Sequence, residues 1–233
     1  MKTFRSLWRK KDQSAMGKVL LVAATRNRGK SVELLTILGE FPVEIRDLND
    51  FGSIPEAVED GSTFEENAYK KASFAAKVLG IPALADDSGL EVEALGGEPG
   101  IRSARYAGPK ASDRANNVKL LRALSGITDR KARFCCVLSL AVPSGQALTF
   151  EATCEGLITD APRGNNGFGY DPLFYYPPMD KTFGEMTLEE KSRVSHRGKS
   201  LMDLKREFHK VLRWLDQRSN EKKVLRGMFD IGG

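Results

Sequence analysis

Short runs of apolar residues, each ended by a turn, recur along the chain and predict the strands of a sheet. The first run, Lys18 to Ala24, is apolar almost throughout, which suits a strand that is covered on both faces. Two later runs flank Pro143-Ser144-Gly145 and predict a long antiparallel hairpin. We expect strands at residues 18–24, 83–87, 90–95, 131–142, 146–158 and 173–176.

Amphipathic stretches with recognisable ends lie between these runs and predict helices. Ser62 and Glu65 have the spacing of a capping box, and Thr187 and Glu190 repeat it. Gly80 is a stop signal for the helix that follows Ser62. We expect helices at residues 30–38, 62–79 and 112–124, from 187 and after 198, with Leu34, Leu35, Leu38, Leu201, Leu204, Phe208, Leu212 and Leu215 facing inward.

Strands that alternate with helices over 233 residues predict one α/β domain, with or without an inserted lobe. We place this domain at residues 18–217, after a basic extension, 1–17, that we expect to be disordered. The extension lacks the apolar core of a secretory signal, although its Arg and Lys content also suits an organelle transit peptide. We expect the tail, 218–233, to be loose or to contact a second subunit.

The charge, the cysteines and the lengths of the apolar runs narrow the function classes. A net charge of +5 suits either a nucleic-acid-binding protein or an enzyme that draws a small anion into a cleft. The three cysteines form no C-x-x-C pair and their number is odd, which excludes a disulfide framework and favours a reducing cytoplasm. No apolar run approaches the roughly 18 residues that a membrane span needs, so we expect no membrane partner.

Asp86 and Asp87 follow the apolar run Ala83 to Ala85 and are the first candidates for chemistry. Adjacent like charges raise each other's pKa, so such a pair usually shares a cation. Mg²⁺ is the natural one, because it prefers hard oxygen ligands and commonly reaches a protein with substrate phosphates. A strand-to-turn corner, in which Asp87 and Ser88 only satisfy backbone groups, explains the same residues without a ligand.

The turn Thr25-Arg26-Asn27-Arg28-Gly29-Lys30 joins a predicted strand to a predicted helix and resembles a nucleotide P-loop. The first glycine of a P-loop is replaced by Ala24, so we reject an NTPase motor. Backbone N–H groups at a helix N-terminus, together with Lys30, still suit an anion. A lysine at this end of a helix is otherwise unfavourable, which favours phosphate binding here.

A glycine-rich segment and a charged cluster complete the candidates. Residues 163–171 surround Phe168, Tyr170 and Asp171 with glycines, which let the backbone approach a flat ligand on which an aromatic ring can stack. An ordinary turn with its aromatic rings in the core fits the same residues. Lys191 to Arg197 bring several hydrogen-bond donors together between two helices, a pattern that is also common on solvated surfaces.

Taken together, these segments resemble the inosine/xanthosine triphosphate pyrophosphatase family, and the match runs in order from about Lys18 to Leu215. The motifs that carry the resemblance are Thr25-x-Asn27-x-x-Lys30-x-x-Glu33, Thr63-Phe64-x-Glu66-Asn67-Ala68, Ala85-Asp86-Asp87-Ser88-Gly89-Leu90, Ala94-Leu95-Gly96-Gly97-x-Pro99-Gly100, Ser103-Ala104-Arg105-Tyr106, Gly167-Phe168-Gly169-Tyr170-Asp171-Pro172 and Ser195-His196-Arg197-Gly198. Asn165-Asn166 departs from the Ser or Thr followed by Gly that the family often has.

The resemblance implies an α/β fold with an elongated mixed β-sheet flanked by helices, two lobes with an active-site cleft between them, and a homodimer. It implies an enzyme that cleaves ITP, dITP and XTP to the monophosphate and pyrophosphate, and so removes deaminated purine nucleotides from the precursor pool. Asp87 matches the general base and a Mg²⁺ ligand, Glu59 matches a second Mg²⁺ ligand, and Asp86 lies in a supporting position. The triphosphate contacts correspond to Thr25, Arg26, Asn27, Arg28, Gly29, Lys30 and Ser88, and the base contacts to Phe168, Gly169, Tyr170, Asp171, Lys191, His196 and Arg197.

On this reading a carboxylate orients a water for attack at the α-phosphorus, and hydrogen bonds select the base. We expect Asp171 to accept a hydrogen bond from N1–H of hypoxanthine while His196 or Arg197 donates to the keto oxygen.

Two other classes of function stay open. A nucleic-acid-binding protein would use Phe168 and Tyr170 as stacking platforms, and another phosphohydrolase would act on a modified pyrimidine triphosphate.

Overall fold

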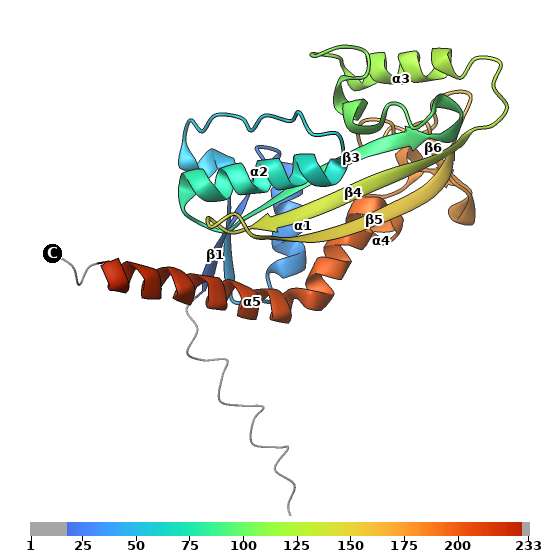
Figure 1. The fold of residues 1–233 in the computed structure, drawn as a ribbon. Helices are drawn as coiled ribbons and strands as arrows, with labels where there is room; N and C mark the ends of the chain where they lie inside the picture. The colour runs from blue at the N-terminus through green and yellow to red at the C-terminus, as the bar shows by residue number, and fades with distance from the viewer. Residues whose placement is uncertain (1–17, 230–233) are drawn as a thin grey trace, which may run out of the picture.

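The computed structural model describes residues 18–229, with side chains to Arg218, and has one seven-stranded sheet at its centre (Figure 1). The strand order is β2-β1-β3-β4-β5-β6-β7. β1 is parallel to both of its neighbours, whereas every pairing from β3 to β7 is antiparallel. The strands are β1 Val19–Ala23, β2 Val43–Asp47, β3 Ala83–Val92, β4 Lys131–Ala141, β5 Ala147–Ile158, β6 Phe174–Tyr176 and β7 Lys181–Thr182.

Helices cover both faces of this sheet, which confirms the predicted mixed α/β class. α2 packs on β3 and β4, and α5 packs on β4 and β5 from the opposite side (Figure 1). The helices are α1 Arg28–Leu38, α2 Phe64–Leu79, α3 Asp113–Ala123, α4 Leu188–Val194 and α5 His196–Phe229. Short 3-10 turns occupy Leu48–Phe51, Glu93–Leu95, Gly100–Arg105 (η3), Pro177–Met179 and Phe183–Glu185. The division into two lobes stays a prediction.

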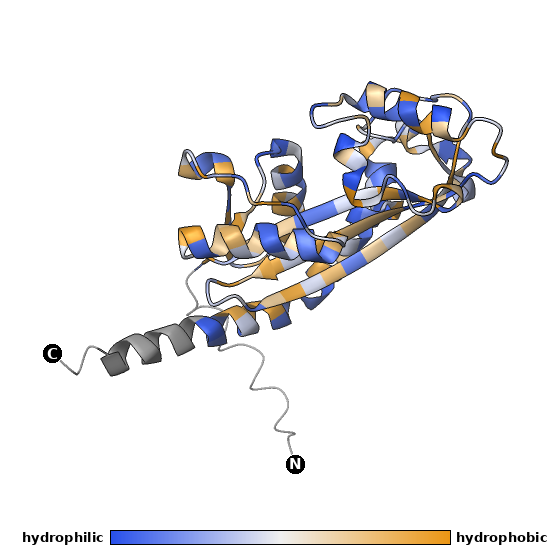
Figure 2. Ribbon diagram, turned by 45° about the horizontal axis from the view of Figure 1, so that its top comes forward, coloured by the Kyte–Doolittle hydropathy of each residue, from blue (hydrophilic) through white to orange (hydrophobic). Residues whose placement is uncertain are grey.

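The alternation of side chains along β3 separates the two faces. Ala83 and Ala85 lie in a cluster with the alanines of α2, whose small side chains let that helix lie close to the sheet. Leu84 points the other way, into a larger cluster formed with α1 and the buried positions of α5. Figure 2 shows the apolar residues that follow the long strands between these helices.

A second core surrounds the far ends of the long strands. Leu90 and Phe134 of β3 and β4 meet Leu120 of α3 and Phe174 of β6 in one buried cluster. The three rings of Phe134, Phe174 and Phe183 contact one another, with centroids 4.6 to 5.8 Å apart. β3, β4 and β5 therefore run through both cores and hold them in one sheet.

Most predicted elements are confirmed, and the cap of one helix and the buried face of another are corrected. The cap of α2 is Thr63, whose side chain accepts a hydrogen bond from the Glu66 N–H, and Ser62 instead donates to the Glu66 carboxylate. Leu35 is exposed, because α1 buries only the narrower stripe of Leu34 and Leu38. All five apolar residues predicted inside the last helix are buried.

The strand predictions need two corrections. The run after Asp87 is not a separate strand, since β3 continues without a break to Val92 and pairs with β4 throughout. Both edge strands were missed: β7 is only two residues long, whereas in β2 Val43 and Ile45 alternate with Glu44 and Arg46 in the pattern of a half-buried strand.

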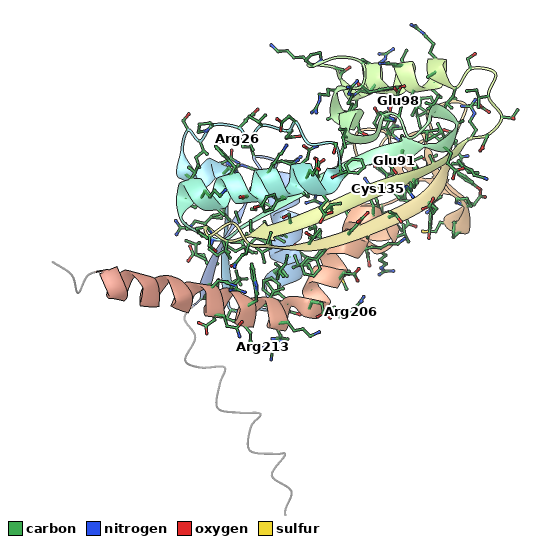
Figure 3. All side chains as sticks on the ribbon, in the orientation of Figure 1. Arg26, Glu91, Glu98, Cys135, Arg206 and Arg213 are labelled. Atoms are coloured by element: carbon green, nitrogen blue, oxygen red, sulfur yellow. The ribbon has the colours of Figure 1, made fainter. Side chains whose placement is uncertain are left out.

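The last helix begins earlier and ends later than expected. The charged cluster Lys191–Arg197 does not lie between two helices, because residues 191–194 end α4 and α5 starts at His196. α5 continues to Phe229 through part of the predicted loose tail. Arg206 and Arg213 project from its outer side (Figure 3). Residues 1–17 and 230–233, with the predicted basic extension, lie outside the described residues. No helix in the described part combines the length and apolar character of a membrane span.

The three cysteines are free and buried, as expected for small apolar side chains. Burial raises the pKa of the Cys136 and Cys154 thiols to about 11 and that of Cys135 to about 12. Cys135 also lies next to the Glu91 carboxylate on the neighbouring strand, which raises its pKa further (Figure 3). These thiols are therefore protonated at neutral pH and suit packing rather than chemistry.

The junction of α4 and α5 gives a test of the fold. A Cβ on Gly198 would lie far inside the normal contact distance from the Ser192 carbonyl oxygen, and a backbone group cannot move aside as a flexible side chain can. We expect Gly198→Ala to lower the free energy of unfolding by about 2–3 kcal/mol in urea denaturation. Met202→Ala, at an exposed position of the same helix, should change it by less than about 0.5 kcal/mol. Equal stability of the two variants would contradict this packing.

Candidate active site

The topology marks one place in the sheet as a binding site. β1 lies between two parallel neighbours, and the helix that joins β1 to β2, α1, lies on the opposite face from the helix that joins β2 to β3, α2. In open α/β sheets, ligands bind outside the carboxyl ends of the strands at such a switch point. β3 extends beyond the end of β1 here, so Asp86 and Asp87 lie beside the turn that follows Ala23.

The turn from Thr25 to Lys30 is held by its own side chains. The Asn27 side chain caps α1 by accepting hydrogen bonds from the N–H groups of Gly29, at 2.9 Å, and Lys30, at 3.3 Å. The Thr25 hydroxyl accepts from the Asn27 N–H at 3.1 Å. A phosphate at this helix N-terminus therefore has to compete with the Asn27 cap for the two amide groups that we expected to be open.

Of the other residues in the turn, Arg26 faces the switch point, whereas Arg28 and Gly29 are exposed. The Arg26 guanidinium donates to the Ile54 carbonyl oxygen at 2.8 Å and so ties the turn to the following loop. Arg28 and Gly29 are exposed on the first turn of α1, and Arg28 lines none of the hollows described below. Of this turn, the side chains that face the switch point are those of Thr25, Arg26 and Lys30.

Asp86 is a buried carboxylate that binds two cations. Its Oδ2 atom accepts from Lys30 Nζ at 2.7 Å and from the Arg197 guanidinium at 2.5 Å, and the side chain is 7% exposed. Burial opposes its ionisation, but Arg197 and Lys30 outweigh this and hold the pKa of the carboxyl well below its usual range. Arg197 also binds Glu33 at 2.6 Å, so α1, β3 and α5 meet at this carboxylate.

Asp87 lies on the opposite face of β3 and has a different partner. Its carboxylate accepts from Lys71 Nζ of α2 at 2.6 Å, and the same ammonium group lies 3.7 Å from Glu59. The two neighbouring aspartates therefore do not share one cation, contrary to the expectation from their adjacency. Successive residues of a strand point to opposite sides, so each carboxylate meets the charges of a different helix.

The environments of these two carboxylates move their pKa values apart. Burial raises the pKa of Asp87, and Lys71 opposes this shift without cancelling it, while Glu59 and Asp86 add to it. Asp86 is held in the ionised form by its two cations. Of the two, Asp87 is therefore the better proton acceptor, because a carboxylate with a raised pKa binds a proton more readily.

The carboxylates of Glu59 and Asp87 could hold a divalent cation beside the Lys71 ammonium group. Lys71 already places one positive charge between them, which shows that the two groups face a common cation position. No group of three or more His, Cys, Asp and Glu side chains with the geometry of a metal cage occurs within residues 18–218. Two carboxylates suit Mg²⁺, which keeps several waters and takes phosphate oxygens to complete its shell.

The glycine-rich loop forms the other end of the site. The buried Asp171 carboxylate accepts a hydrogen bond from the Phe168 N–H at 2.8 Å and another from Lys191. Burial raises the pKa of Asp171, and Lys191 counteracts part of this shift. The Phe168 ring is 63% exposed and lies 4.7 Å from the Lys191 ammonium group, so it forms an open aromatic wall. Gly167 has φ of +77°, which lets the loop close tightly over Asp171.

Tyr170 is buried, whereas Ser88 lines the hollow beside this loop. Tyr170 is 4% exposed and donates its hydroxyl to the Ser103 carbonyl oxygen at 2.9 Å. It belongs to the core, so it cannot serve as the stacking platform that the nucleic-acid reading required of it. Ser88 lines the hollow beside the loop, and its hydroxyl lies 3.5 Å from Asp86.

His196 is a neutral, buried imidazole. Its ring stacks on Phe134 with centroids 4.6 Å apart and planes inclined by 11°. Burial lowers its pKa to about 3, and the nearby Lys191 and Arg197 charges add to the shift. Its Nδ1 atom is buried without a hydrogen-bond partner, in the described part of the chain, next to the hollow that the ring lines. A neutral ring has one donor and one acceptor nitrogen, which suits recognition of a polar ligand edge.

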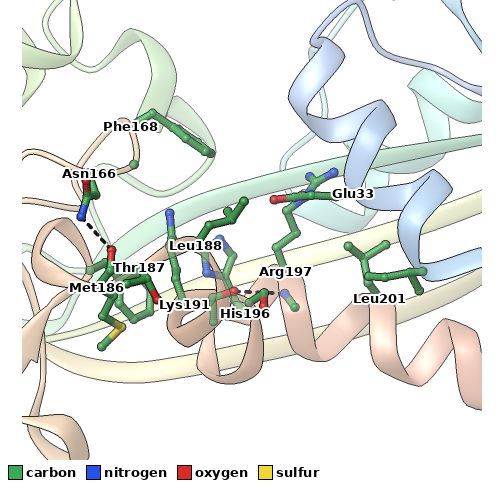
Figure 4. Close-up of a pocket in the computed structure, with 16 residues that line it drawn as sticks. Glu33, Asn166, Phe168, Met186, Thr187, Leu188, Lys191, His196, Arg197 and Leu201 are labelled. Carbon is green, nitrogen blue, oxygen red and sulfur yellow. Dashed lines mark hydrogen bonds and ion pairs between the residues drawn. The ribbon is translucent and has the colours of Figure 1, made fainter.

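These parts form a row of hollows along β3. A hollow of about 300 Å³ lies between the glycine-rich loop and the α4–α5 junction, with Phe168, Lys191, His196 and Arg197 on its walls (Figure 4). A second hollow lies at the switch point between Lys30, Glu59 and Lys71. A narrow space lined by Lys30, Asp86 and Arg197 lies between them. Of the predicted phosphate residues, Thr25, Arg26 and Lys30 line the second hollow, and the predicted base residues that line the first are Phe168, Lys191, His196 and Arg197.

Three residues of the site were not assigned from the sequence. Lys71 lies two helical turns after Thr63, on the side of α2 that faces the sheet, and this spacing was available as a signal. Glu33 lies in a motif quoted above, yet nothing local indicates its ion pair with Arg197. Asn166, where the family often has glycine, donates its amide to the Met186 carbonyl oxygen at 3.0 Å and so joins the loop to the segment before α4.

Comparisons with known proteins agree with this architecture. The model of the Ham1 family matches residues 21–207. The dITP/XTP pyrophosphatase of Syntrophobacter fumaroxidans is 69% identical over 213 residues, which cover 91% of this chain and 92% of that protein. The Staphylococcus aureus Ham1 protein is 44% identical with a TM-score of 0.77, covering 82% of this chain and 98% of that one. A Coxiella burnetii HAM1 protein is 41% identical with a TM-score of 0.79, covering 82% of this chain and 99% of that one. The chain therefore belongs to the Ham1 family.

Proposed function

We propose that this protein hydrolyses ITP, dITP and XTP to the nucleoside monophosphate and pyrophosphate. The observation that carries the proposal is the part-buried Asp87–Lys71 pair, whose Lys71 lines the hollow at the switch point together with Glu59 and the Thr25–Lys30 turn. The relatives named dITP/XTP pyrophosphatase, among them one from Desulfotalea psychrophila that is 56% identical, support the same activity.

The polyphosphate would lie in the hollow at the switch point. Lys30 and Lys71 supply positive charge there, and the Thr25 hydroxyl and the Asn27-capped end of α1 supply polar groups. Lys30 is held by the buried Asp86, so its ammonium group is already placed when the substrate arrives. Such preorganised charge stabilises the negative charge that develops on the departing pyrophosphate.

The chemical step needs a base and an oriented water. We assign Asp87 this role, because burial raises its pKa and Lys71 fixes the position of its carboxylate. The water oxygen bonds to the α-phosphorus, its proton passes to Asp87, and the bond from the α-phosphorus to the bridging oxygen breaks to release pyrophosphate. Glu59 and Asp87 would hold Mg²⁺, which when bound neutralises phosphate oxygens as a Lewis acid.

The base would lie between the exposed Phe168 ring and the first turn of α5. Hypoxanthine presents an N1–H donor, which the Asp171 carboxylate can accept, and a keto oxygen, to which neutral His196 can donate. Two of the guanidinium nitrogens of Arg197 bind Glu33 and Asp86, so a contact with the base would use its remaining donors. Adenine has the opposite pattern and would leave buried groups unpaired.

Three features of the assembly are proposed on the family resemblance. We expect a homodimer, a cytoplasmic location, and a cleft between two lobes as the shape of the site. The nucleic-acid alternative is weaker than before, since Tyr170 is buried and the acidic residues Glu59, Asp86 and Asp87 have partners within a small-molecule site. The substrate panel described below distinguishes the proposed activity from that of a phosphohydrolase acting on pyrimidine triphosphates.

The first test is a panel of purine and pyrimidine nucleoside triphosphates, with release of pyrophosphate as the readout. We expect kcat/KM for ITP, dITP and XTP to exceed that for ATP by roughly 10⁴-fold, because a site built to pair donors rejects the mismatched base. EDTA should abolish turnover and added Mg²⁺ should restore it. Comparable rates with ATP and ITP, or a preference for a pyrimidine, would refute the proposed selectivity.

Asp87→Asn tests the assigned base. The amide keeps the shape of the side chain but cannot take the proton from water, so kcat for ITP should fall by about 10²- to 10⁴-fold. Asp60→Asn is the matched control, since Asp60 is an exposed carboxylate that pairs with Lys70, and its variant should keep wild-type turnover. If Asp87→Asn turns over near the wild-type rate with Mg²⁺ bound, the assignment is wrong.

Because the pKa of His196 is low, we expect the pH profile of kcat/KM for ITP to show no titration of this histidine. The folded value of about 3 lies below the ordinary 6.5, so the ring stays neutral at all pH values well above 3. We expect His196→Gln to leave the shape of the kcat/KM profile for ITP unchanged between roughly pH 5 and 8, while its height falls. An inflection near pH 6.5 that is present in the wild type and lost in the variant would contradict a neutral His196.

A further inference from the structure

Both backbone polar groups of Gly169 are held by one helix. The Asp113 carboxylate at the start of α3 accepts a hydrogen bond from the Gly169 N–H at 2.7 Å. The Asn117 side chain donates to the Gly169 carbonyl oxygen at 3.1 Å. Asp113 and Asn117 are four residues apart and therefore lie on the same face of α3. The helix thus clamps one residue of the glycine-rich loop at two points.

Gly169 lies where the loop passes from the open site to the core. The residue before it, Phe168, is 63% exposed on the wall of the base hollow, and the residue after it, Tyr170, is 4% exposed. Gly169 itself has φ of +62°, a conformation that favours glycine. Fixing this residue therefore fixes the angle at which the Phe168 ring leaves the loop and the position of Asp171 two residues later.

The helix that provides the clamp is itself anchored. Asn116, between the two clamp residues, accepts from the Ala107 N–H at 2.8 Å and donates to the Ala104 carbonyl oxygen at 3.2 Å. Leu120 and Leu124 are fully buried in the core around the far ends of the long strands. The clamp therefore connects the loop to a fixed support and not to another loop.

We propose that Asp113 and Asn117 are positioning residues that set the geometry of the base-binding loop and thereby its discrimination between purines. This inference rests on the proposed function, in which Phe168 and Asp171 contact the base. Asp113 also lines the hollow beside the loop, but the role proposed for both residues is to hold the loop and not to contact the substrate. Their role is to keep the Phe168 ring and the Asp171 carboxylate at a constant distance from His196. If these groups shift relative to one another, the hydrogen bonds to any base are poorly formed.

The test combines amide hydrogen exchange with kinetics on four full-length variants. Asp113→Ala removes the acceptor, Asp113→Asn keeps an acceptor oxygen without the charge, and Asn117→Ala removes the donor. Arg114→Ala is the matched control, because Arg114 is an exposed charged neighbour on the same helical turn. Exchange of residues 167–171 is measured by mass spectrometry, with β4 as an internal reference, and kcat and KM are measured with ITP and ATP.

We expect Asp113→Ala to raise exchange in residues 167–171 by about tenfold, since a hydrogen bond to a charged acceptor is lost there. The same variant should raise KM for ITP more than it lowers kcat, and should reduce the ITP-to-ATP preference by about tenfold. Asn117→Ala should show smaller changes in the same direction. Asp113→Asn and Arg114→Ala should stay within about twofold of the wild type, because each keeps an acceptor oxygen for the Gly169 N–H.

Three results would overturn the inference: unchanged exchange in Asp113→Ala, faster exchange with unchanged preference, or equal effects of Asp113→Ala and Asp113→Asn. The first would mean that the clamp does not hold the loop, the second that the loop does not set selectivity, and the third that charge acts in place of the hydrogen bond. A wild-type protein that does not hydrolyse ITP would refute the proposed function instead, while the exchange data would still decide whether the clamp exists.

Discussion

The buried carboxylate of Asp86 is the interaction on which the arrangement of the site depends. It belongs to β3 and accepts hydrogen bonds from Lys30 of α1 and from Arg197 of α5. Breaking one side of such a buried pair leaves an uncompensated charge and typically costs about 3–5 kcal/mol. Because Arg197 follows His196 in the first turn of α5, the same ion pairs connect the base end of the site to the phosphate end.

The pleat of β3 gives its two aspartates different tasks. Asp86 faces α1 and α5 and stays ionised between two cations, whereas Asp87 faces α2 and has a raised pKa despite Lys71. One carboxylate organises the positive groups, and the other remains available for a proton. Neighbouring residues of one strand can thus serve structure and chemistry separately, because the sheet places them in unlike surroundings.

Local signals in the sequence predicted most elements, and long-range pairing explains most of what they missed. The cap at Thr187 and the apolar runs of the hairpin led to the right helix and strands. The pairing of Asp86 with Arg197 joins residues 111 positions apart, and that of Asp87 with Lys71 depends on how α2 crosses the sheet. Adjacency along the chain suggested a shared cation instead, although the alternation of side chains along a strand sends neighbouring residues to opposite faces.

A crystal structure with Mg²⁺ and a non-hydrolysable ITP analogue tests the central claim most directly. We predict that the triphosphate lies at the switch point beside Lys30 and Lys71, with the cation on Glu59 and Asp87 and the hypoxanthine ring against Phe168. A triphosphate bound elsewhere, or bound there without a cation on either carboxylate, would contradict the account.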